Sequence, residues 1–139
     1  MSPTKQKQQF TAEEKAAMRA RAKELKETED GETAIRQALA KMSADDRALG
    51  ERINTLVRET APDLIPKTWY GMPAYANKDG KVVCYFKNAG KFKARYSELG
   101  FNDAAKLDEG AMWPIVYALT KLTKADEARI TKLVKQAVS

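Results

Sequence analysis

The chain has 139 residues, of which 43% are hydrophobic and 32% are charged, and its net charge is +6. This length suits one folded domain, and the composition is that of a soluble protein without the roughly 20-residue apolar run that a membrane-spanning helix needs. The sequence has no histidine and a single cysteine, which excludes an intrachain disulfide, histidine-based catalysis and metal sites built from histidine or paired thiolates.

The N-terminal third of the sequence predicts a tail followed by two helices. Residues 1–10 are expected to be a disordered tail, after which Thr11 and Glu14 form a capping box that starts the first helix. A break is predicted at Asp30-Gly31, followed by a second, short helix. The apolar stripe of the first helix is narrow, so we expect residues 11–42 to be a helical extension of the domain.

The middle of the sequence changes from a helical to an extended pattern. Ser43 caps a stronger helix that is expected to end before Pro62. Two extended segments follow, and then a turn at residues 77–80, where the Asp-Gly pair is a strong hairpin signal. The unbroken apolar run at residues 82–86 predicts a central strand covered on both faces. We expect the thiol of Cys84 in this strand to be inert, and the alternative is a thiolate activated by the nearby Lys81 and Lys87.

The remaining sequence completes a predicted antiparallel meander. Residues 91–96 alternate between apolar and basic side chains, which predicts a strand with a basic face formed by Lys91, Lys93 and Arg95. Residues 98–112 are expected to be irregular or briefly helical, residues 113–119 to form an edge strand, and Thr123 to cap a C-terminal helix. The expected fold class is α+β, an antiparallel meander packed against helices, with an N-terminal helical extension and a C-terminal helix.

Two neighbouring features indicate a binding surface. Residues 66–75 contain three aromatic residues, two prolines and a glycine, a combination that forms either a rigid entry to the core or the wall of a pocket. From Lys67 to Arg95 there are seven basic residues and one acidic residue, a positive charge that favours anions. A solvated face without a ligand, or lysines that protect a strand edge, remain alternatives. The candidate ligand-binding residues are Lys67, Trp69, Tyr70, Met72, Tyr75, Lys91, Lys93 and Arg95.

The Tyr-Gly-Met-Pro segment at residues 70–73 is followed by Tyr75, a glycine-containing turn and an apolar strand. This arrangement resembles the YdhG-like family, a group of bacterial domains of unknown function, over about residues 43–139. The resemblance implies a compact α+β domain with an antiparallel sheet, and it transfers no catalytic residue. One branch of the family has been likened to frataxin and assigned an iron-chaperone role, which would rest on acidic surface carboxylates.

These observations predict a cytoplasmic, non-enzymatic domain without a cofactor, a catalytic residue or a membrane partner. Its expected ligand is a small anion or an acidic protein. An iron-binding chaperone and a nonspecific nucleic-acid binder are the alternatives, followed by an enzyme that uses tyrosine, lysine or carboxylate groups. No metal ligand is assigned, because the loose carboxylate clusters match no metal-binding loop.

Overall fold

A computed structural model of the protein describes residues 9–139, and the first eight residues of the expected tail lie outside this range. Two helices are followed by five strands and a last helix. Their bounds are α1 (Ala12–Ala40), α2 (Ala44–Thr60), β1 (Ile65–Trp69), β2 (Met72–Ala76), β3 (Val82–Lys87), β4 (Ser97–Phe101), β5 (Val116–Leu119) and α3 (Lys124–Ala137).

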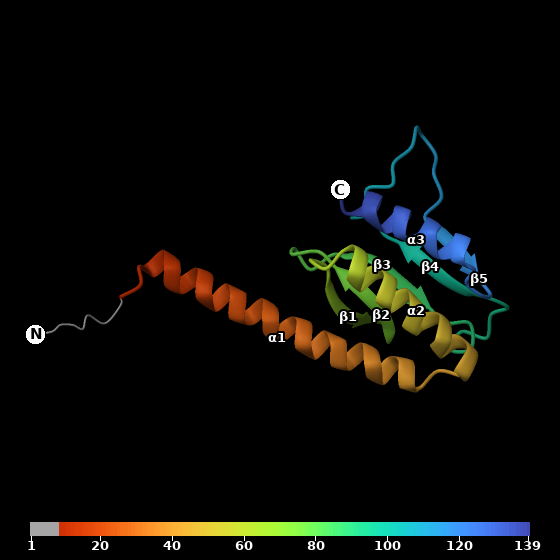
Figure 1. The fold of residues 1–139 in the computed structure, drawn as a ribbon, viewed down its shortest axis with the longest axis horizontal. Helices are drawn as coiled ribbons and strands as arrows, with labels where there is room; N and C mark the ends of the chain where they lie inside the picture. Colours follow the sequence, from red (N-terminus) through yellow and green to blue (C-terminus); the bar gives the residue numbers. More distant parts are fainter. Residues whose placement is uncertain (1–8) are drawn as a thin grey trace, which may run out of the picture.

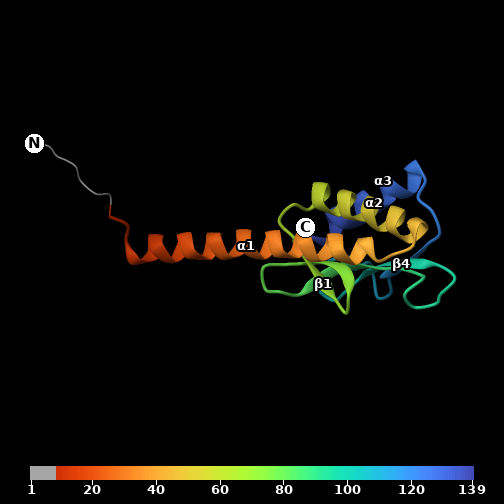
Figure 2. The same cartoon turned by 90° about the horizontal axis from the view of Figure 1, so that it is seen from below.

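The five strands form one antiparallel sheet in the order β1-β2-β3-β4-β5, so every strand pairs with its neighbours in sequence (Figure 1). All three helices lie on the same side of this sheet, as Figure 2 shows. The expected α+β meander with an N-terminal and a C-terminal helix is therefore confirmed. Among residues 9–139, no helix combines the length and the apolar character that crossing a membrane requires.

The hydrophobic core lies between the sheet and the helices. Its largest fully buried side chains come from both layers and include Tyr75, Phe86, Phe101, Ile35, Ile53 and Leu99. Burial of one such side chain contributes about 1.5–3 kcal/mol, so this face of the sheet carries most of the stability. The central position of β3 is confirmed, and its Cys84 is fully buried, although the helices cover only one of its two faces (Figure 2).

Helix α1 runs without interruption through Asp30 and Gly31, so the break predicted there is wrong. A Cβ atom at Gly31 would overlap the carbonyl oxygen of Pro66 in β1. The glycine therefore serves the close approach of the helix to the strand, a role that needs its missing side chain, and the helix pays only the modest cost of a glycine in its interior.

The two halves of α1 have different surroundings. The second half contributes Ile35 and Leu39 to the core, whereas the first half projects away from the sheet (Figure 1) and leaves Met18 and Leu25 each 51% exposed. The core therefore begins before residue 43, where the sequence predicted the start of the domain.

Residues 91–96 form no strand, so the strand predicted there is wrong. The amide of Ala94 donates a hydrogen bond to the carbonyl oxygen of Ala89 at 2.9 Å, which curls this segment into turns. Lys93 has a φ of 53°, a left-handed conformation that interrupts an extended chain. The strand β4 starts only afterwards, at Ser97, and pairs with β3. It extends into the stretch 98–112 that was expected to be irregular.

Several local predictions are confirmed. Thr11, Ser43 and Thr123 are the N-caps of the three helices, and each side-chain oxygen accepts a hydrogen bond from a backbone amide of the first turn. The turn at residues 77–80 joins β2 to β3, and β5 is an edge strand, although it is shorter than the predicted span 113–119.

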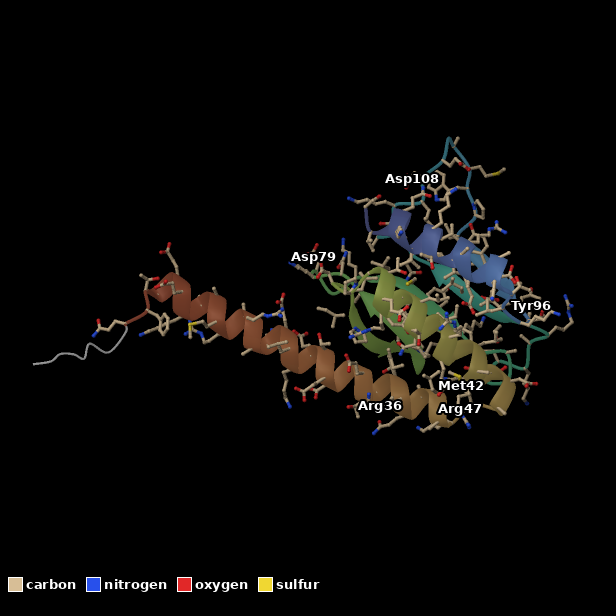
Figure 3. All side chains as sticks on the ribbon, viewed as in Figure 1. Arg36, Met42, Arg47, Asp79, Tyr96 and Asp108 are labelled. Atoms are coloured by element: carbon tan, nitrogen blue, oxygen red, sulfur yellow. The ribbon has the colours of Figure 1, made fainter. Side chains whose placement is uncertain are left out.

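The two ends of the sheet carry different connections, because the meander alternates its turns between them. The β2–β3 turn lies at one end, and the β1–β2 turn and the loop at residues 88–96 lie at the other. Figure 3 shows this separation, with Asp79 of the β2–β3 turn and Tyr96 at opposite ends of the sheet. The basic residues between Lys67 and Arg95 are therefore divided between the two ends.

Candidate functional site

The β1–β2 hairpin positions the central part of residues 66–75, the segment rich in aromatic residues and proline. Trp69 pairs with Met72, so only Tyr70 and Gly71 form the turn, and both have positive φ angles of 52° and 76°. A two-residue turn with two positive φ angles has the type I′ pattern, for which asparagine, aspartate and glycine are favoured. A left-handed conformation costs a residue such as tyrosine about 1–2 kcal/mol. Tyr70 nevertheless occupies this position, and it is 77% exposed.

The register of the strands assigns their side chains to the two faces of the sheet. Pro66, Tyr75, Cys84 and Phe101 are paired in one row, and its members face the helices, since paired residues share a face. The neighbouring row consists of Lys67, Ala74, Tyr85 and Gly100. It therefore lies on the opposite side, which we call the helix-free face.

Aromatic rings cover the middle of the helix-free face. The ring of Trp69 lies 5.2 Å from that of Tyr85 and 5.1 Å from that of Tyr70, measured between centroids. Small residues lie in the same row as Tyr85, because Ala74 is fully buried and a Cβ atom at Gly100 would overlap the Tyr85 ring. Partial burial, and then the charge of Glu98, raise the pKa of the Tyr85 hydroxyl.

A shallow hollow of about 370 Å³ lies beside the Trp69 ring. Its polar lining consists of Lys67 from β1, Lys81 from the β2–β3 turn, and Asn102 and Asp103 from the segment after β4. The ion pairs among residues 9–139 do not include either lysine. The hollow therefore presents two ammonium groups, one carboxylate and an aromatic ring to a ligand.

The three basic residues expected on one strand face are distributed differently. The Nζ atom of Lys91 donates a hydrogen bond to the carbonyl oxygen of Tyr70 at 2.9 Å, which brings Lys91 to the β1–β2 turn. Lys93 is exposed at its left-handed position, and the guanidinium of Arg95 lies 5.3 Å from the centroid of the Tyr96 ring. Of these three basic residues, only Lys91 thus contacts residues 66–75.

Lys87 joins the site from the end of β3. Its Nζ atom lies 4.8 Å from the centroid of the Phe92 ring, and that of Lys91 lies 5.6 Å from the same centroid. Phe92 is itself 42% exposed. The end of the sheet near the β1–β2 turn therefore carries a second cationic and aromatic group, in which Lys87 lies on the helix-free face, two residues after Tyr85 in β3.

Two predicted ligand-binding residues are buried. Tyr75 faces the helices, where its hydroxyl donates a hydrogen bond to Oδ1 of Asn54 at 2.7 Å, and burial raises its pKa. Met72 is also buried. Burial likewise raises the pKa of the Cys84 thiol to about 12, in agreement with its predicted inertness. Lys67, Trp69, Tyr70 and Met72 are the predicted members on the helix-free side of the sheet, where Met72 pairs with Trp69 but is buried.

A larger hollow of about 580 Å³ lies between the end of α1, the β1–β2 turn and the loop after β3. Lys41 and Lys91 line it, but so does Asp46, whose carboxylate accepts hydrogen bonds from Asn88 and from the amide of Gly90. No aromatic side chain lines this hollow, and the ammonium of Lys91 is engaged with Tyr70. Its chemistry is therefore less suited to an anion than that of the hollow beside Trp69.

Lys81, Tyr85, Lys87 and Asn102 belong to the site but were not predicted from the sequence. Tyr85 was hidden in an apolar run that gives no sign of which side chain faces which side. The Asp-Gly turn signal did locate Lys81 next to a hairpin, and the register of that hairpin would have been needed to find its neighbours.

Comparisons with known proteins add no relative to this description: no family model matches the chain, and no curated protein or solved structure matches it. Within residues 9–139, no three side chains of the His, Cys, Asp and Glu types gather as a potential metal-binding group.

Proposed function

We propose that this chain is a non-enzymatic binding protein that holds an anionic ligand on the helix-free face of its sheet. One observation carries the proposal: two lysines that form no ion pair with a carboxylate of residues 9–139 lie with a tryptophan around a hollow of about 370 Å³. The ligand would contact Lys67, Lys81 and Trp69, and Asn102 can donate or accept a hydrogen bond beside them.

The charges around this hollow favour an anion over a cation. Lys67 and Lys81 outnumber Asp103 in the lining, and ligand sites typically combine an apolar or aromatic wall with a few polar groups that set orientation. Both lysines line the hollow, and Lys67 is half-buried whereas Lys81 is exposed.

The buried nucleophile of the chain supports a binding role over a catalytic one. Cys84 lies on the opposite side of the sheet, and the raised pKa of its thiol keeps it protonated at neutral pH. The polar and aromatic side chains that line the hollow are two lysines, one aspartate, one asparagine and one tryptophan, and these suit recognition without a covalent step.

The proposal is tested by measuring the melting temperature with and without inorganic pyrophosphate. Binding to the native state alone raises the melting temperature, by an amount that grows with the ratio of ligand concentration to Kd. We expect pyrophosphate to stabilise the wild-type chain, and the double variant Lys67→Gln/Lys81→Gln to lose this stabilisation.

The matched control is Lys132→Gln/Lys135→Gln, which removes two exposed lysines of α3 on the helix-covered side. This control loses the same net charge but should keep the stabilisation by pyrophosphate. Equal losses in the two double variants would show that the effect is one of net charge, and would overturn the proposed site.

A further inference from the structure

The chemistry of the helix-free face extends beyond the hollow, and we infer that its anionic ligand is a single-stranded nucleic acid bound without sequence preference. This inference rests on the proposed function, since it uses the same face and includes Lys67, Lys81 and Trp69. It adds the ring series and the second basic group near the β1–β2 turn.

Cationic groups lie at both ends of the aromatic series. Lys67 and Lys81 line the hollow on one side of Trp69, and Lys87 and Lys91 lie around Phe92 at the other end of the sheet. Along β3, the six steps from Lys81 to Lys87 span about 20 Å at roughly 3.3 Å per residue. A strand with a phosphate at each nucleotide can reach both groups, whereas a single small anion can reach only one.

The rings between these groups form one packed aromatic cluster, in which the ring plane of Trp69 is inclined at 60° to that of Tyr70 and at 58° to that of Tyr85. Tyr70, Trp69 and Tyr85 follow one another at centroid distances of 5.1 and 5.2 Å. Proteins that bind single strands combine a positively charged path with aromatic side chains on which bases stack, and every base has a face suited to this. The series therefore fits unpaired bases better than it fits an acidic peptide.

Tyr70 gives a second, independent indication of a ligand. It occupies a left-handed turn position that asparagine or glycine would adopt at lower cost, and its ring is 77% exposed. The backbone of this turn does not favour a tyrosine, and the Tyr70 ring, although it packs edge-on against that of Trp69, stays largely exposed. Strained positions of this kind are concentrated at binding sites, which agrees with a ring presented to an unpaired base.

The geometry favours a single strand over a duplex. Bases in a duplex are stacked on one another and present only their edges, so aromatic side chains gain contact mainly with unpaired bases. Reading a B-form major groove requires a helix or a protruding ribbon, and the helices all lie on the other side of the sheet (Figure 2).

Two carboxylates also lie on or beside this face and limit its charge. Glu98 pairs with Lys87 in the strand register, and Asp103 lines the hollow. Of the four lysines, Lys91 already donates a hydrogen bond to the Tyr70 carbonyl oxygen, so we expect contacts to about three phosphates. Binding should then weaken with salt along a slope of about −2 in log K against log salt concentration.

The test is the fluorescence anisotropy of a labelled oligothymidylate of about 12 nucleotides, titrated with the full chain between about 50 and 200 mM salt. We expect saturable binding with the stated slope, and weaker competition from a duplex of the same length. Tyr70→Asn should weaken binding by about fivefold or more. Lys67→Gln should make the slope shallower by about 0.7.

The control variant Lys132→Gln/Lys135→Gln should leave both the affinity and the slope close to the wild-type values. Equal competition by single strand and duplex, or unchanged affinity in a folded Tyr70→Asn variant together with an unchanged slope in Lys67→Gln, would overturn the inference. Stabilisation by pyrophosphate without tighter binding of the oligothymidylate would overturn the inference and leave the proposed function standing. The absence of both effects would overturn both.

Discussion

The two faces of the sheet are built from different kinds of residue. The helix-covered face carries large side chains that are fully buried, such as Tyr75, Phe86 and Phe101. The helix-free face has small residues, Ala74 and Gly100, in the same row as a tyrosine ring that is only half-buried. Dense packing accounts for the first face, but it does not account for the exposed ring and lysines of the second.

This difference separates residues that hold the fold together from residues available for binding. Substitutions on the helix-covered side should act on stability and leave binding unchanged. Substitutions on the helix-free face should act on binding and change stability little, since surface changes away from special features are usually within about 0.5 kcal/mol. The expected effects on the free energy of unfolding decrease in the order below.

Gly31→Ala should have the largest effect, because the new Cβ atom would overlap the Pro66 carbonyl oxygen and force α1 away from β1. We expect the free energy of unfolding in urea to fall by about 3 kcal/mol, at the upper end of the usual cost of overpacking. The matched control is Thr33→Ala, an exposed residue of the same helix, which should change stability by no more than about 0.5 kcal/mol. Equal effects of the two would contradict the close approach of helix and strand.

The pH dependence of stability should reveal the burial of Cys84. Its pKa is raised from the ordinary value of 9.0 to about 12, so above pH 9 the unfolded chain loses a thiol proton that the native chain keeps. The contribution of the protonated Cys84 thiol to the free energy of unfolding is complete below pH 9, and it is lost as the pH rises toward 12. This thiol alone should lower the free energy of unfolding by about 2 kcal/mol between pH 9 and 11.

Cys84→Ala isolates this contribution, because it removes the titrating group. Its free energy of unfolding should fall less steeply between pH 9 and 11 than that of the wild type, whatever the stability of the variant at pH 7. Parallel pH profiles would mean that the thiol is solvated in the native state.

Tyr75→Phe tests the helix-covered face with the smallest change of shape. It removes the hydroxyl that donates to Asn54 and should lower stability by about 1.5 kcal/mol, since the acceptor loses its partner. Stabilisation by pyrophosphate should be unchanged, because Tyr75 lies on the other side of the sheet. The control Tyr117→Phe removes a hydroxyl without a side-chain hydrogen-bond partner among residues 9–139, so it should leave the stability nearly unchanged. A loss of pyrophosphate binding in Tyr75→Phe would contradict the division of the sheet into two faces with separate roles.

Tyr70→Asn should have the smallest effect on stability, and in the opposite direction. Asparagine adopts the left-handed turn position more readily, so the free energy of unfolding should stay constant or rise by up to about 1 kcal/mol. Urea denaturation of this variant provides the number. A clear loss of stability would mean that the Tyr70 ring serves folding, and that its exposure is no indication of a ligand.

The sequence predicted those elements that interactions within a few residues decide. Thr123 and Asp126 form a capping box by themselves, and the Asp79-Gly80 pair is enough to predict a hairpin. The prediction failed where the local structure depends on a contact with a residue far away in the sequence. Gly31 looked like a helix break because its reason, the Pro66 carbonyl, lies in another element.

The alternation at residues 91–96 misled in the same way. A period of two predicts a strand only if one face has a core to cover, and Phe92 in this segment is 42% exposed. The candidate site was predicted in part for a related reason. Lys67, Trp69 and Tyr70 lie together, but a two-residue turn at Tyr70 and Gly71 makes Trp69 pair with Met72, which sends Tyr75 to the opposite face.

The most direct test of the helix-free face is a nuclear magnetic resonance titration of the nitrogen-15-labelled chain with unlabelled oligothymidylate. It needs no substitution, and the indole signals of Trp69 and Trp113 can be followed separately. The account predicts that the Trp69 indole and the amides of β1, the β1–β2 turn and β3 shift in a saturable manner, while those of α3 stay in place. Shifts concentrated on α2 and α3, or a Trp69 signal that stays in place while the strand binds, would contradict it.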